Sequence, residues 1–168
     1  MGCGMVRKVD ELGRVVIPKE MRRVLNIKTG SSIEMFINDE NQVVLKKFSE
    51  INNTLYLVEN LADIIYDCFS LNCLVSDDEK VVVCKGLSKK EYLNKKIPRL
   101  LIDKEDYLEL ENKENSLINE YGYTYVFPIK NEGYDCGFVF AFNVNRLDKS
   151  ILNSILVLTK FLSNMLKF

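Results

Sequence analysis

Over the first 47 residues, apolar and polar positions alternate in short runs that predict small β-strands. Residues 5–9 and 14–17 contain β-branched side chains, and the acidic stretch 10–13, which ends in glycine, predicts a turn between them. Pro18 has the fixed backbone angle suited to the first turn of a helix, so a helix is expected next. Helical spacing places three apolar residues on one face of that helix: Met21, Val24 and Leu25.

A hairpin pattern follows this helix. Apolar residues alternate with polar ones in 33–37 and again in 42–46, and the four polar residues 38–41 between them predict the turn. The predicted order is therefore strand, strand, helix, strand, strand. A unit this small buries little apolar area, so it needs a second copy for stability.

The pattern changes beyond residue 48. Residues 48–53 are short and polar, which predicts a linker, and the polar tract 88–120 predicts helical pieces, the first of them capped by Ser88. Two stretches have the apolar spacing of amphipathic helices: Leu55, Val58, Ala62, Ile65 and Phe69, then Ile151, Ile155, Leu158, Leu162 and Met165. Four runs between them predict strands: 72–76, 80–85, 123–129 and 137–143. The apolar stripes of both helices are wider than packing on one sheet requires, which predicts contact with a second subunit.

Charge is distributed unevenly along the 168 residues. The net charge is −1, but residues 1–47 hold nine Lys and Arg against six Asp and Glu, whereas residues 48–168 hold fourteen against eighteen. Between Arg7 and Lys28 there are seven cations and three anions, which is +4 per chain and +8 per dimer. This basic segment favours an acidic partner.

The five cysteines are odd in number and contain no C-x-x-C pair, which predicts free thiols in a reducing cytoplasm. No apolar run approaches the length of a membrane span, so no membrane association is expected. The opening Met1-Gly2-Cys3 lacks the later hydroxyl residue of a myristoylation signal, because position 6 is Val6.

Residues 6–23 read V-R-K-V-D-E-L-G-R-V-V-I-P-K-E-M-R-R, and this stretch resembles the DNA-binding start of the AbrB family of bacterial transition-state regulators. The resemblance implies a swapped-hairpin β-barrel, formed as an intertwined dimer, over residues 1–48. It also implies double-stranded DNA as the partner. The residues it assigns to DNA are the matching arginines Arg7, Arg14, Arg22 and Arg23. Lys8 lies beside them and is a further candidate, and Lys46 and Lys47, at the end of the last predicted strand, are weaker ones. We expect contacts to phosphates and recognition of groove shape, because no recognition helix or Asn/Gln array is evident.

Each cation also has a simpler interpretation. Arg22 and Arg23 would complement the dipole at a helix C-terminus, and Arg7 and Arg14 would keep a strand face soluble. The intact eighteen-residue pattern favours the DNA-binding interpretation over these.

After the linker 49–53, residues 54–168 have the element order of a GAF-type sensor domain, and residues 88–95 resemble the GAF domain of the family's sporulation regulators. The whole chain is therefore expected to be an α+β protein. GAF domains bind small molecules, which makes four residues candidates for lining a pocket: Cys84, Tyr92, Phe127 and Phe138. Plain core packing is the alternative for each. With no histidine in the chain, we expect no metal and no cofactor.

The function expected from these features is that of a sequence-preferring transcriptional regulator of the sporulation type, cytoplasmic and associated with the nucleoid. Its second domain would sense an unknown effector or assemble the chain into a tetramer through its helices. The sequence offers no nucleophile beside a base, so an enzyme is not expected. An antitoxin-like autoregulator with the same N-terminal fold and a scaffold without DNA binding remain as alternatives.

Overall fold

The computed structural model describes residues 4–98, 106–111 and 121–166, so Cys3 and the start of the chain lie outside the described residues. The chain divides into two compact units, Met1–Phe48 and Ser49–Phe168. Each is described by itself below.

Unit 1 contains helix α1 (Lys19–Val24) and an antiparallel hairpin of β1 (Ile33–Ile37) and β2 (Val43–Lys47). This confirms the predicted hairpin with its turn at 38–41, and in its register Ile33 lies opposite Lys47 and Ile37 opposite Val43. Its turn is closed by Asn38, whose side-chain oxygen accepts hydrogen bonds from the backbone N–H groups of residues 40 and 42.

The prediction of strands at residues 5–9 and 14–17 is wrong for the single chain. They form a turn with extended arms, but neither arm joins a β-ladder among the described residues. A strand requires hydrogen-bonding partners along its edge, and within one described chain these arms find none. Unit 1 also lacks a core of its own, since Pro18 is the only residue classed as buried among its described positions.

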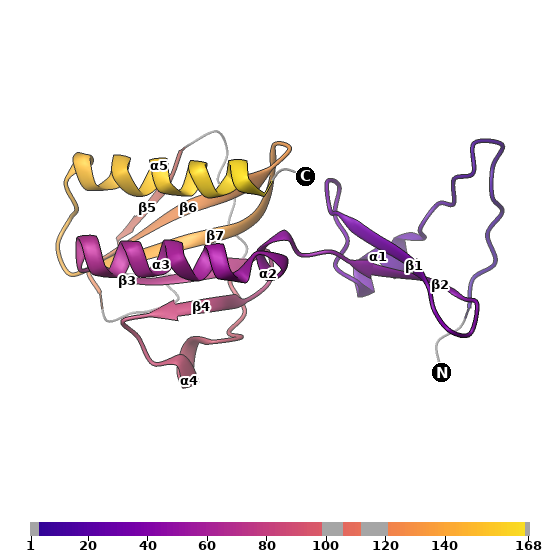
Figure 1. Cartoon of the computed structure of the whole chain (residues 1–168), viewed down its shortest axis with the longest axis horizontal. Coiled ribbons are helices and arrows are strands. Elements are labelled where there is room, and N and C mark those ends of the chain that lie inside the picture. The colour runs from indigo at the N-terminus through magenta and orange to yellow at the C-terminus, as the bar shows by residue number, and fades with distance from the viewer. Residues whose placement is uncertain (1–3, 99–105, 112–120, 167–168) are drawn as a thin grey trace. The chain divides into compact units, whose positions relative to one another are not determined.

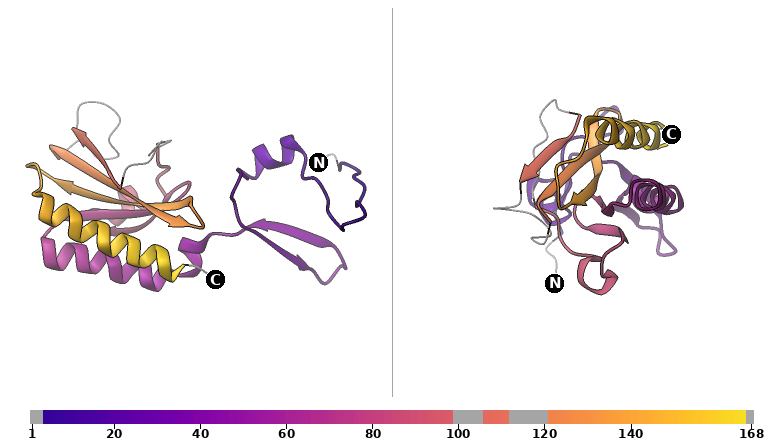
Figure 2. Two further views of the ribbon diagram at one scale, coloured as in Figure 1. Left: turned by 90° about the horizontal axis from the view of Figure 1, so that it is seen from above. Right: turned by 90° about the vertical axis from the view of Figure 1, so that its left-hand side faces the viewer.

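Unit 2 is built on a five-stranded antiparallel sheet with the order β4-β3-β7-β6-β5. Its elements in chain order are α2 (Glu50–Asn53), α3 (Leu55–Phe69), β3 (Asn72–Asp77), β4 (Val81–Lys85), α4 (Lys89–Tyr92), β5 (Leu108–Glu111), β6 (Tyr123–Asn131), β7 (Tyr134–Asn143) and α5 (Lys149–Met165). The two long helices, α3 and α5, lie side by side over one face of the sheet (Figures 1 and 2). Both long helices and the four predicted strands are thus confirmed, with small shifts at their ends.

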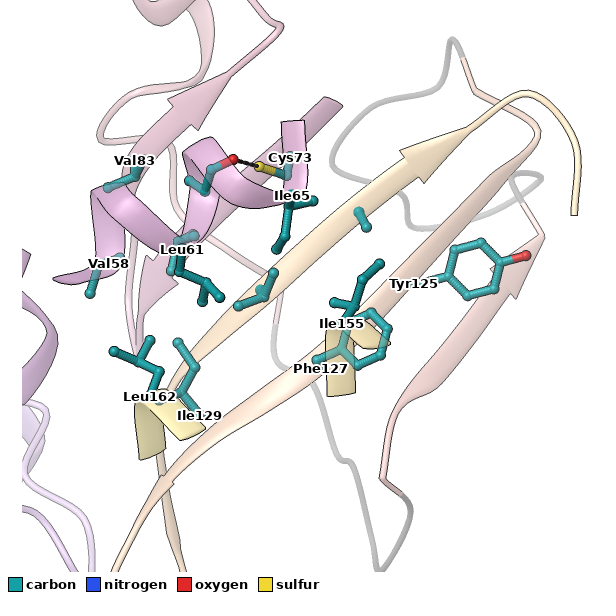
Figure 3. Close-up of a cluster of buried hydrophobic side chains, with 14 of the residues drawn as sticks. Val58, Leu61, Ile65, Cys73, Val83, Tyr125, Phe127, Ile129, Ile155 and Leu162 are labelled. Carbon is teal, nitrogen blue, oxygen red and sulfur yellow. Dashed lines mark hydrogen bonds between the residues drawn. The ribbon is translucent and has the colours of Figure 1, made fainter. Parts of the chain in front are cut away.

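The main core lies between these helices and the sheet (Figure 3). Side chains that step by three or four residues along α3 and α5 meet alternate side chains of β3, β6 and β7, as the two periodicities require. The labelled members include Val58, Leu61 and Ile65 from α3, Ile155 and Leu162 from α5, and Cys73, Tyr125, Phe127 and Ile129 from the sheet.

The stretch predicted as a linker, 49–53, is instead part of unit 2. Ser49 caps helix α2 by accepting a hydrogen bond from the backbone N–H of Asn52, and Ile51 is fully buried. Gly137 on β7 makes room for this, because a Cβ there would lie 2.4 Å from the carbonyl oxygen of Ser76 and 2.9 Å from Ile51 Cγ1. The polar residues around Ile51 gave no sign in the sequence that this side chain is buried against the sheet.

Two further details differ from expectation in the tract 88–120. Helix α4 is present, but the Ser88 side chain makes no capping hydrogen bond; instead its carbonyl accepts the N–H groups of Glu91 and Tyr92. The tract also contains an unpredicted strand, β5, paired with β6 at the edge of the sheet. Four residues are too few to register as a periodic pattern, so pairing with β6 determines this strand.

Candidate nucleic-acid interface

All five predicted DNA-binding side chains lie at exposed positions of unit 1. Arg7 and Lys8 are on the first arm of the turn and Arg14 begins the second arm. Arg22 and Arg23 are in the last turn of α1, next to the helix C-terminus. The arrangement leaves these cations accessible to a ligand.

The turn that separates Arg7 and Lys8 from Arg14 is closed by backbone hydrogen bonds. The N–H of Asp10 donates to the carbonyl of Arg14, and the N–H of Gly13 donates to the carbonyl of Asp10, both at 3.0 Å. Gly13 has a φ of +75°, the left-handed conformation that glycine adopts at little steric cost. The loop is therefore a tight three-residue connection.

The Asp10 carboxylate adds three hydrogen bonds to this turn. Its Oδ1 accepts from the backbone N–H groups of Leu12 at 3.0 Å and Arg14 at 2.8 Å, and its Oδ2 accepts from Arg14 Nε at 2.8 Å. The backbone and side-chain hydrogen bonds from Arg14 lower the pKa of Asp10 below its ordinary value, because they stabilise the ionised carboxylate. Sequence reasoning placed Asp10 only in a turn and missed this contact.

Helix α1 presents its apolar residues as well as its cations. Met21 and Leu25 are half exposed and Val24 is 82% exposed, although their spacing predicts a buried stripe. Among the described residues, the stripe is therefore only partly covered. The position of Arg22 and Arg23 beside the helix C-terminus also satisfies the simpler dipole interpretation.

The four candidate pocket residues of unit 2 do not lie together. Cys84, Tyr92 and Phe138 belong to a second apolar cluster, on the face of the sheet away from α3 and α5. Phe127 belongs to the helix-side core, where its ring lies 5.3 Å from that of Tyr107. The expectation that all four residues line one pocket is therefore wrong for Phe127. Phe138 of β7 is paired with Pro128 of β6, and Phe127, the neighbour of Pro128, points to the opposite face of the sheet.

The remaining three candidates are packed as core residues. Cys84 Sγ donates to the carbonyl of Leu87 at 3.4 Å, and burial raises the pKa of this thiol. Phe138 contacts the ring of Phe140, with centroids 6.4 Å apart. Ser76, which no sequence pattern singles out, is a fully buried residue of β3, and its Oγ has no hydrogen-bond partner among the described residues.

The described part of the chain holds no group of three or more potential metal ligands. Within the same residues no helix is long and apolar enough to cross a bilayer.

Comparison with known proteins gives independent information on both units. Residues 6–50 match a family model described as antidote-toxin recognition MazE, bacterial antitoxin. The transition state regulatory protein AbrB of Bacillus subtilis is 47% identical over 60 residues, which cover 36% of this chain and 60% of that protein. Both matches agree with the predicted AbrB-type N-terminal domain.

The longer matches extend over unit 2. Its fold is similar to that of the blue-light absorbing PixJ GAF domain of Thermosynechococcus elongatus, with a TM-score of 0.52 at 12% identity, covering 71% of this chain and 88% of that one. Stage V sporulation protein T of Bacillus subtilis is 38% identical over 152 residues, which cover 85% of each chain. The chain therefore belongs to the AbrB-type family of bacterial transition-state and sporulation regulators, with an AbrB-like N-terminal domain followed by a GAF-like domain.

Proposed function

We propose that this regulator binds double-stranded DNA through Arg7, Lys8, Arg14, Arg22 and Arg23, presented together by a dimer of unit 1. The observation that best supports this is the exposure of all five cations on the segment that carries the family's sequence pattern. Membership of a family of transition-state regulators supports the same conclusion.

The dimer follows from what unit 1 leaves uncovered. Large apolar side chains are exposed along both arms of the turn and along the hairpin, among them Val6, Val9, Val16, Met35 and Ile37. Many large apolar side chains exposed on one small unit are typical of a surface that a partner covers. A second copy would cover them and supply strand partners for residues 5–9 and 14–17, which is the swapped-hairpin arrangement that the resemblance implies.

The dimer would bring the +4 segment of each chain onto one +8 surface. Arginine and lysine on such a surface neutralise phosphates and release counterions, which gives affinity with a steep salt dependence. Sequence preference would then arise from groove width and deformability rather than from an array of base contacts. A protein that binds DNA in this way would act at the nucleoid, in the bacterial cytoplasm.

Unit 2 provides a surface for further assembly. Val157 and Phe161 are each about two thirds exposed and lie one turn apart on α5, with Met165 half exposed one turn beyond. Pairing of this stripe with a second dimer would make a tetramer that engages DNA at two places, so effective concentration would raise avidity. A small-molecule effector would regulate this assembly from the face of the sheet away from α3 and α5, beside the apolar cluster that contains Cys84, Tyr92 and Phe138.

The match to the antitoxin model favours one alternative function, an antitoxin-like autoregulator. The regulator is preferred because similarity to stage V sporulation protein T extends over 85% of the chain and includes the folded second unit.

The experiment is a fluorescence anisotropy titration of the full chain. The probe is a labelled 30-bp duplex enriched by the chain from a randomised library, measured at 50 and 200 mM salt beside a shuffled duplex of equal composition. Binding that prefers the enriched duplex and weakens by orders of magnitude at the higher salt is expected. Equal or absent binding at 50 mM salt would refute the function, and a monomer by native mass spectrometry would refute the assembly.

A further inference from the structure

We propose that Asp10 is a positioning residue for DNA recognition, which holds the Arg14 guanidinium in the orientation that meets the duplex. This inference rests on the proposed function, since it concerns the same surface, and it assigns a binding role to an anion within a cationic segment.

The two oxygens of the Asp10 carboxylate have separate partners. Oδ1 accepts two backbone N–H groups of the turn, from Leu12 and Arg14. Oδ2 accepts the side-chain Nε of Arg14 at 2.8 Å. The first oxygen is thus sufficient to close the turn, and the second is left to fix a side chain.

The bond through Nε leaves the recognition end of Arg14 available. A guanidinium has five N–H donors, and Nε supplies only one of them. The four donors on the terminal nitrogens have no partner among the described residues, and the side chain remains 71% exposed. Terminal nitrogens are the groups that bind phosphate or a guanine edge in bidentate fashion.

Because Asp10 already holds the Arg14 side chain in the free protein, less side-chain conformational entropy is lost when DNA binds. An unrestrained arginine loses its rotamer freedom when it is fixed on a phosphate. Here the side chain is anchored on a turn that is itself closed by backbone hydrogen bonds and by a left-handed glycine, Gly13. The orientation of the guanidinium is therefore set by the fold of the turn.

The same carboxylate also repels phosphate, so its net effect on affinity requires a matched comparison. Glu11 is the neighbouring anion in the same turn, it is exposed, and no contact of its side chain is found among the described residues. Glu11→Gln removes the same charge at nearly the same place without touching Arg14. The difference between Asp10→Asn and Glu11→Gln is therefore free of the effect of the lost charge.

Asp10→Asn is the informative substitution because asparagine retains an oxygen for the two turn amides and replaces Oδ2 by an N–H donor. That donor cannot accept the Nε hydrogen of Arg14. Circular dichroism and thermal melting of the full-length variants establish that the fold is retained. The variants are then titrated with the enriched 30-bp duplex and the shuffled duplex at 50 mM salt.

We expect Asp10→Asn to bind the enriched duplex about 3- to 10-fold more weakly per chain than Glu11→Gln, with less discrimination against the shuffled duplex. In an Arg14→Ala background the two substitutions should give equal affinities, because the positioned group is gone. A structural role in the turn would keep them different in that background.

Two results would overturn the inference while leaving the proposed function intact. One is equal affinity of Asp10→Asn and Glu11→Gln with Arg14 present, and the other is a difference that persists after Arg14→Ala. Failure of the wild-type chain to bind either duplex would instead refute the proposed function itself.

Discussion

The carboxylate of Asp77, at the end of β3, accepts a hydrogen bond of 3.0 Å from the side-chain amide of Asn52 in helix α2. Its other oxygen accepts the backbone N–H groups of Glu79 and Lys80, both at 2.8 Å. One buried side chain therefore ties the first helix of unit 2 to the turn between β3 and β4. The order of these elements in the sequence contains no sign of the contact, because 25 residues separate the two partners.

Asp77→Ala should lower the free energy of unfolding of unit 2 by about 1–3 kcal/mol, because it removes the acceptor of three hydrogen bonds. Asp77→Asn should cost less, since an amide oxygen still accepts the two turn N–H groups. Urea unfolding followed by circular dichroism measures both. A larger loss for asparagine than for alanine would contradict this assignment of the two oxygens.

Tyr125→Phe should also destabilise unit 2, by about 1–3 kcal/mol. The Tyr125 hydroxyl accepts a hydrogen bond of 2.8 Å from the buried backbone N–H of Leu147, which lies just before α5. Removing the hydroxyl leaves that N–H unsatisfied. Tyr123→Phe is the matched control on the same strand; its hydroxyl has no hydrogen-bond partner among the described residues, so a change within about 0.5 kcal/mol is expected. Similar losses in both variants would count against the role of the Leu147 bond.

The thiols of buried Cys73 and half-buried Cys136 predict how stability depends on alkaline pH. Burial raises the pKa of Cys73 and of Cys136 to about 12, from an ordinary value of 9.0. Between these values the unfolded chain releases thiol protons that the folded chain retains, so stability should fall as pH rises from about 9 toward 12. Urea unfolding at pH 8, 9 and 10 measures the slope, and Cys136→Ala should reduce it. An unchanged slope in that variant would show that its thiol does not contribute.

Arg22→Ala and Arg23→Ala should each reduce the salt dependence of DNA binding, by about one in the slope of log affinity against log salt for each chain of the bound dimer. Each variant removes one cation that would neutralise a phosphate. Lys149→Ala, which removes an exposed cation from α5 in unit 2, is the control and should leave the slope unchanged. Slopes that match the wild type for both arginine variants would assign these residues to the helix dipole alone.

Local patterns were sufficient for the hairpin of unit 1 and for both long helices of unit 2. In each case the signal lies within a few residues, as in the alternation across Ile33–Ile37 or the three- and four-residue steps along Leu55–Phe69. The eighteen-residue cationic pattern likewise identified the family, which the comparisons confirm. These features depend on period and residue type, which a sequence displays directly.

Features that depend on distant partners were beyond the sequence. The residues of helix α2 have the composition of a linker, because its one buried apolar residue, Ile51, is surrounded by polar residues. The four pocket candidates were placed together, but strand register assigns Phe127 to the helix-side face and Phe138 to the other. The alternation of residues predicts which side chains of a strand share a face, but it does not predict which helices or loops cover that face.

The family, the long elements of unit 2 and the cationic segment of unit 1 can be predicted from the residues alone, because all three depend on residue types at short spacing. The contact of Asp77 with α2 and the contact of the second Asp10 carboxylate oxygen with Arg14 are instead properties of the folded chain. Hydrogen bonds of this kind depend on distances of about 3 Å and on direction. Chain folding sets those quantities, and composition and periodicity do not contain them.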